Sequence, residues 1–154
     1  MIKKLVLALS MAAVVGLPLA TPSATADSPV REIHGHGKQA CPERSLCLYQ
    51  DRDFNGRHDA PVWVLNGHDV DQLSKYDAND RASSVYYRAP FAWYAYLCEH
   101  ASCGEGDFKL IHGAASYETL DGLNGDHGTM VNSSEKRVWL TDSISAVRFG
   151  STNR

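Results

Sequence analysis

The sequence lacks the features that mark several common functional classes. It has no His-Glu-x-x-His, no Gly-x-Ser-x-Gly and no glycine-rich phosphate loop. It has no run of basic residues, and its formal net charge is −3, so it is a poor candidate for binding nucleic acid or an anionic membrane. No apolar run after residue 19 is long enough to span a membrane. We expect a protein that is not an enzyme; catalysis stays the weakest alternative, because a triad assembled in space need not follow a sequence motif.

The first 26 residues have the pattern of a secretory signal peptide. Lys3 and Lys4 give a charged start, residues 5–19 form an apolar core, and residues 24–26 (Ala-Thr-Ala) form a small-residue cleavage site. The expected mature chain begins at Asp27, is secreted and is extracellular. Removal of the leader leaves 128 residues with a formal charge of −5, which suits one domain with a hydrophobic core. We expect this domain to be a monomer.

The four cysteines fall into two close pairs, Cys41 with Cys47 and Cys98 with Cys103. An even number of cysteines in an exported chain favours disulfides. Four cysteines permit three connectivities, and the spacing favours a disulfide within each close pair. Zinc binding would need close ligand pairs such as Cys-x2-Cys, which neither interval supplies. Each disulfide is expected to stiffen a local loop rather than to join distant parts of the chain.

Short β-prone segments separated by turn-forming residues predict an all-β domain over residues 41–150. No amphipathic stretch is long enough to form a dominant helix, although residues 71–75 could form a short helical turn. Residues 27–40 are polar and lack apolar periodicity, so we expect a flexible arm there, and residues 151–154 are expected to form a tail. The predicted strands lie at residues 46–49, 60–65, 84–88, 91–98, 108–112 and 146–150.

A motif that combines a loop with a strand occurs twice, 62 positions apart. The first copy begins Asn79-Asp80-Arg81-Ala82-Ser83, and the second begins Thr141-Asp142-Ser143-Ile144-Ser145. Such a repeat predicts two copies of one supersecondary unit. Four strands per copy, with the loop before the last strand, suit a pair of Greek keys. The second copy is longer by about 15 residues, which places an insertion within residues 113–136.

The first copy resembles a βγ-crystallin Greek key. Tyr49-x4-Phe54-x-Gly56 is similar to the aromatic hairpin of that family, and Asn79-Asp80-x-x-Ser83-Ser84 is similar to its calcium motif. The resemblance implies a sandwich of two Greek-key motifs, in which Gly56 provides the backbone freedom to fold the hairpin over the sheet.

The same resemblance implies calcium binding by the two loops, which could assemble two sites if they lie side by side. Calcium prefers six to eight oxygen ligands, and few carboxylates are offered here, so affinity should be weak. Thr141 and Ala146 depart from the family pattern in the second copy. The alternative is that each loop is only a turn capped by its own side chains. The implied ligands are Asp80, Ser83 and the Arg81 carbonyl, together with Asp142, Ser145 and the Ser143 carbonyl.

The cysteine frame is similar to peptidase inhibitor family thirty-six, which groups secreted proteins of the metalloproteinase-inhibitor type. The similarity rests on Cys41-Pro42-x-x-Ser45-Leu46-Cys47-Leu48-Tyr49 and on the later Cys98-x4-Cys103 interval. It implies that the loop Cys98-Glu99-His100-Ala101-Ser102-Cys103 is presented to an extracellular protease of the thermolysin type, with the Cys98–Glu99 bond at the catalytic zinc. A loop already held in its bound shape loses little entropy on docking.

Glu99 departs from what such a protease prefers, since thermolysin-type enzymes favour an apolar side chain just after the cut bond. An unpaired carboxylate in an apolar pocket costs several kcal/mol. The loop could therefore act on a different protease, or it could no longer inhibit. The alternative function is a calcium-binding structural or toxin-like βγ-crystallin without inhibitory activity.

Overall fold

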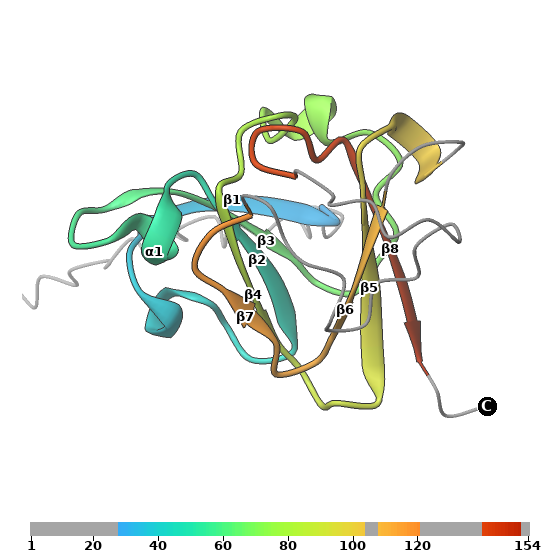
Figure 1. The fold of residues 1–154 in the computed structure, drawn as a ribbon, viewed down its shortest axis with the longest axis horizontal. Coiled ribbons are helices and arrows are strands. Elements are labelled where there is room, and N and C mark those ends of the chain that lie inside the picture. The colour runs from blue at the N-terminus through green and yellow to red at the C-terminus, as the bar shows by residue number, and fades with distance from the viewer. Residues whose placement is uncertain (1–27, 104–107, 121–139, 152–154) are drawn as a thin grey trace, which may run out of the picture.

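The computed structural model describes residues 28–103, 108–120 and 140–151, which form two antiparallel β-sheets with short helical turns between the strands (Figure 1). The first sheet has the order β1-β3-β2-β4-β7, and the second has the order β6-β5-β8. The strands are β1 (Val30–Gly35), β2 (Ser45–Tyr49), β3 (Ala60–Leu65), β4 (Ser84–Arg88), β5 (Trp93–Cys98), β6 (Phe108–His112), β7 (Ser116–Tyr117) and β8 (Ala146–Ser151). The turns are α1 (Arg52–Asn55) and the 3-10 turns η1 (Lys38–Ala40), η2 (Leu73–Tyr76) and η3 (Ala101–Cys103).

Each Greek key contributes a segment that pairs with a strand in the sheet of the other. β7 follows β6 in the chain but pairs with β4 at the edge of the first sheet. In the opposite direction, Val70 from the first unit forms an antiparallel bridge with Val147 of β8. The exchange ties the two units into one sandwich, which confirms the predicted all-β fold of two βγ-crystallin-like motifs.

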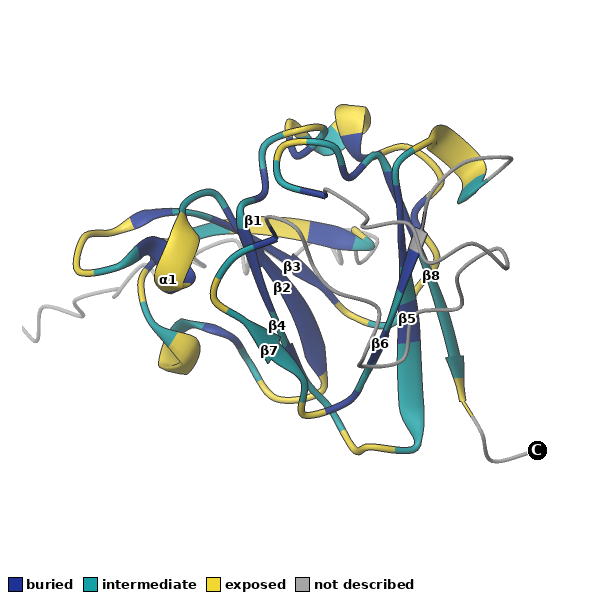
Figure 2. Ribbon diagram, viewed as in Figure 1, coloured by how far each residue is buried: buried dark blue, intermediate teal, exposed yellow. Residues whose placement is uncertain are grey.

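The core lies between the two sheets, and Figure 2 shows its buried residues in dark blue on strands of both sheets. Successive side chains of a strand point to opposite faces of its sheet. In β5 the inward residues Ala95 and Leu97 are fully buried, whereas Tyr94 and Tyr96 lie on the other face and are half-buried. Trp63 and Tyr87 are the largest side chains in this core. This alternation explains why the β pattern could be read from the sequence.

The prediction of a flexible arm over residues 27–40 is wrong for residues 30–35, which form a strand. Val30–Gly35 forms β1, and all six of its residues pair with β3 in an antiparallel register. Only Val30 and Gly35 are buried in this strand, because it lies at the edge of the sheet. Backbone pairing therefore holds a segment whose side chains are mostly polar.

The predicted aromatic hairpin folds over the first sheet. Phe54 packs edge-on against Tyr49, with ring centroids 5.5 Å apart. Asp53, Phe54, Asn55 and Gly56 all have φ between 53° and 66°, so the chain makes a tight left-handed turn here. Gly56 has ψ of −112°, a combination that glycine reaches without the steric cost of a Cβ atom.

Both predicted disulfides are present, Cys41–Cys47 and Cys98–Cys103. Within the described residues, no helix is long and apolar enough to cross a membrane. The predicted signal peptide lies outside the described residues, as do most of the predicted insertion and residues 152–154 of the tail.

Candidate functional site

The two repeated loops lie side by side and exchange hydrogen bonds. The Ser83 hydroxyl donates to Asp142 Oδ1 at 3.4 Å, and the Ser145 hydroxyl donates to Asp80 Oδ1 at 3.3 Å. The backbone hydrogen bonds between the two loops are reciprocal in the same way. Asp80 N donates to the Ile144 carbonyl at 3.2 Å, and Asp142 N donates to the Ala82 carbonyl at 3.0 Å. We call residues 79–83 and 141–145 the paired loops.

Local backbone geometry turns the two carboxylates of the paired loops outward. Asp80 has φ of 54° and Asp142 has φ of 52°, and both side chains are exposed. Aspartate tolerates this left-handed conformation better than most residues. The structure therefore places each predicted carboxylate beside the serine hydroxyl of the other loop, which the repeat alone could not establish.

The donor chemistry of the paired loops fits a hard cation. Two carboxylates and two hydroxyls supply only oxygen atoms, the ligands that calcium takes. Arg81, whose carbonyl was also predicted to be a ligand, directs its guanidinium away, to Asp77 and to Gln50 Oε1 at 3.1 Å. Across the described parts of the chain, no group of three or more His, Cys, Asp or Glu side chains is placed to hold a metal ion. A calcium ion here would therefore depend on hydroxyls, carbonyls and water to complete its coordination.

The disulfide loop, residues 98–103, lies at the end of β5. Cys98 is the last residue of that strand and is 3% exposed, whereas His100, Ala101 and Ser102 are exposed. The disulfide to Cys103 joins Cα atoms 5.2 Å apart. The loop thus starts inside the sheet and presents its middle to solvent.

The bond predicted to meet a protease begins at a carbonyl that is already engaged. The Cys98 carbonyl accepts a hydrogen bond from Ser145 N at 2.8 Å. Glu99, which follows it, is half-buried. A zinc ion that polarised this carbonyl would share its oxygen with the Ser145 amide, because a carbonyl oxygen has two lone pairs.

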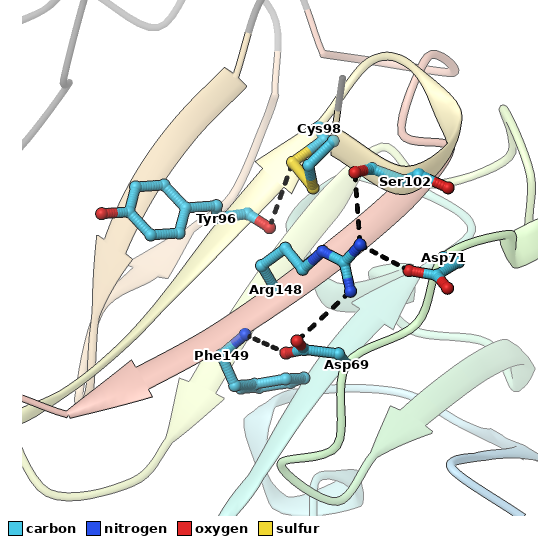
Figure 3. Close-up of a disulfide and its surroundings, with 8 residues drawn as sticks. Asp69, Asp71, Tyr96, Cys98, Ser102, Arg148 and Phe149 are labelled. Atoms are coloured by element: carbon cyan, nitrogen blue, oxygen red, sulfur yellow. Dashed lines mark hydrogen bonds and ion pairs between the residues drawn. A yellow bond between two sulfur atoms is a disulfide. The ribbon is translucent and has the colours of Figure 1, made fainter.

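Beside the disulfide loop lie three residues that the sequence analysis did not identify as functional: Asp69, Asp71 and Arg148 (Figure 3). Arg148 forms ion pairs with Asp69 Oδ2 at 3.2 Å and Asp71 Oδ1 at 2.6 Å, and it donates to the Ser102 carbonyl at 3.3 Å. We call these three side chains the arginine clamp. Arg148 follows the repeated loop motif directly, but nothing in the spacing of Asp69 and Asp71 pointed to it.

Two sheets that exchange a segment, joined by paired acidic loops, define a βγ-crystallin-like protein. A solved structure described as "Evolution of the eye lens beta-gamma-crystallin domain fold" is similar with a TM-score of 0.54 and 19% identity, covering 80% of this chain and 99% of that one. Spherulin 3a from Physarum polycephalum is similar with a TM-score of 0.48 and 17% identity, covering 80% of this chain and 97% of that one. The first likeness, at 19% identity, shows the fold alone.

Residues 35–110 match the model of Peptidase inhibitor family I36. Over these residues, just under half of the chain, the protein resembles that family, and its fold is βγ-crystallin-like. No curated protein matches the chain. The matched residues include both disulfides, the hairpin and the whole disulfide loop, but they end before the second of the paired loops. The family match favours an inhibitor over an enzyme.

Proposed function

We propose that this protein is a secreted inhibitor of extracellular metalloproteases that presents residues 98–103 to the enzyme, with calcium held weakly between the paired loops. The observation that carries the proposal is the family match, which extends through the complete disulfide loop. The exposure of His100, Ala101 and Ser102 supports it, because these residues can reach a partner without any rearrangement of the sheet.

The mechanism rests on a loop that is fixed before it binds. The disulfide and the arginine clamp restrict the loop, so docking costs little conformational entropy. If a protease cut the Cys98–Glu99 bond, the disulfide would still join the two new ends through Cys98 and Cys103. Ends held in this way can be rejoined, which slows release of the enzyme's product.

Glu99 is the residue that we expect to limit affinity. A carboxylate that enters an apolar pocket without a partner loses its hydration. The test is to incubate a panel of metalloproteases and serine proteases with the wild type and with Glu99→Val, with and without calcium. The matched control is Glu43→Val, which makes the same change in the other disulfide loop, at a side chain that is 82% exposed.

The expected result is an inhibition constant for a thermolysin-type enzyme that falls about 100-fold in Glu99→Val and stays unchanged in Glu43→Val. Absence of inhibition by both the wild type and Glu99→Val would contradict the proposal. That outcome would favour the second candidate, a calcium-binding structural protein. The engaged Cys98 carbonyl is the observation that favours this candidate.

A further inference from the structure

Arg148 lies on the outer face of β8, next to the disulfide loop. Its neighbours Val147 and Phe149 pack toward the core, so the Arg148 side chain points away from it, across from Tyr96 on β5. The side chain is 34% exposed. Figure 3 shows this side chain beside Cys98 and Ser102 of the disulfide loop.

The guanidinium of Arg148 is itself held in place. Asp69 and Asp71 flank it, and Asp69 also accepts a hydrogen bond from Phe149 N through Oδ1 at 2.7 Å. Between the two aspartates, Val70 pairs with Val147 through two backbone hydrogen bonds of 2.8 and 2.9 Å. The acidic partners of Arg148 are thus fixed to the same strand that carries it.

Ser102 is the point at which this cluster holds the disulfide loop. Its carbonyl accepts the bond from Arg148, and its N–H donates to the Asp71 carbonyl at 2.7 Å. Ser102 has φ of 60°, and Cys103, next to it, has φ of 49°. Two consecutive non-glycine residues in this region are costly, and such conformations persist only where the surroundings hold them.

We propose that Arg148 is the positioning residue of the disulfide loop: it fixes Ser102 and thereby the conformation in which residues 99–101 are presented. The role in presentation rests on the proposed inhibitory function, whereas the conformational role does not. Arginine suits the task because its planar fork can bond several acceptors at once, which the single ammonium group of lysine cannot do in the same geometry. If the Cys98–Glu99 bond were cut, the clamp on Ser102 would also hold the new end near its original position.

The test compares the wild type with Arg148→Lys, which keeps the charge and removes the fork. The control is Arg88→Lys, because Arg88 bonds the Cys41 carbonyl at 2.9 Å and Glu43 at 3.4 Å beside the other disulfide. Two quantities are measured: amide hydrogen exchange at Ser102, and inhibition of the protease that the wild type inhibits best. The Leu97 amide, in the central strand of the second sheet, reports whether the fold is intact.

We expect exchange at Ser102 to rise at least about ten-fold in Arg148→Lys, with exchange at Leu97 unchanged and inhibition weakened about ten-fold. Arg88→Lys should change neither quantity. Equal Ser102 exchange in the wild type and Arg148→Lys would overturn the proposal, as would a rise at Ser102 that is matched at Leu97. If the wild type inhibits no protease and Ser102 exchange still rises selectively, the inhibitory function fails while the positioning role of Arg148 stands.

Discussion

The backbone N–H of Ser145 donates to the Cys98 carbonyl at 2.8 Å, while the hydroxyl of Ser145 donates to Asp80 at 3.3 Å. One residue therefore joins the paired loops to the first residue of the disulfide loop. Groups that share a hydrogen-bonded residue respond together when one of them is ordered. The candidate cation site and the candidate inhibitory loop are thus parts of one connected structure.

Calcium is expected to stabilise the protein through the paired loops. A ligand at ten times its dissociation constant stabilises the folded state by about 1.4 kcal/mol per site. For a domain of this size that corresponds to a rise in the midpoint of thermal unfolding of about 3–6 °C. The change to make is the double variant Asp80→Asn with Asp142→Asn, which should lose most of the shift.

The control for the calcium experiment is Asp59→Asn. Asp59 is 67% exposed and pairs with His36 at the end of β1, away from the paired loops. This variant should keep the full shift in midpoint at millimolar calcium. A wild type whose midpoint does not change with calcium would remove the cation site from the proposed function.

Ser84 should matter for stability far more than its size suggests. Its side chain is fully buried, its hydroxyl donates to the Asp51 carbonyl at 2.6 Å, and it accepts a hydrogen bond from Phe54 N at 3.1 Å. Ser84→Ala leaves both backbone groups of the hairpin without this partner, so we expect the free energy of unfolding to fall by about 2 kcal/mol. Urea denaturation measures it, and Ser74→Ala at an exposed position should stay within about 0.5 kcal/mol of the wild type.

The two disulfides should differ in their response to a reductant. Cys41 and Cys47 are both 0% exposed, whereas Cys103 is partly exposed. Because thiol–disulfide exchange needs access to a sulfur atom, Cys98–Cys103 should be reduced first. Mild reduction under native conditions, followed by alkylation and mass spectrometry, identifies the order. Labelling of Cys41 or Cys47 before Cys103 would contradict this expectation.

Strands that are rich in apolar and β-prone residues could be predicted from the sequence, as β3 and β5 show. β1 could not, because a strand at the sheet edge with one covered face keeps polar residues along most of its length. β7 has only two residues, too few for any periodicity to register. The repeat of Asp80 and Asp142 predicted a pair of loops, but their reciprocal hydrogen bonds depend on the exchange of segments between the sheets.

The arginine clamp was beyond sequence analysis for a related reason. Asp69 and Asp71 lie more than 70 residues before Arg148, and the bridge between Val70 and Val147 brings them together. Exposed charged residues are common on any surface, so their types alone carry no signal. The contact arises from the topology of the fold and not from a local pattern.

The stability of the protein should rise between pH 8 and pH 10 because of Lys109. This side chain is 1% exposed, its Nζ lies 4.6 Å from the centroid of the Tyr117 ring, and burial lowers the pKa of Lys109 to about 8 from an ordinary value of 10.5. Between these two values the unfolded chain binds more protons than the folded one, so the free energy of unfolding increases with pH. Above pH 10 the trend should reverse, because burial raises the pKa of Tyr49 and of Tyr87 to about 12.

Lys109→Met tests the rising part of this profile. It replaces a buried ammonium group with an apolar side chain of similar length, so it should stabilise the protein at pH 7 and remove the increase between pH 8 and pH 10. The fall above pH 10 should remain, since it depends on the buried tyrosines. Urea unfolding at a series of pH values measures the free energy of unfolding of the wild type and of Lys109→Met. Lys75→Met, at an exposed position, is the control. If the increase persists in Lys109→Met, a group other than Lys109 is responsible for it.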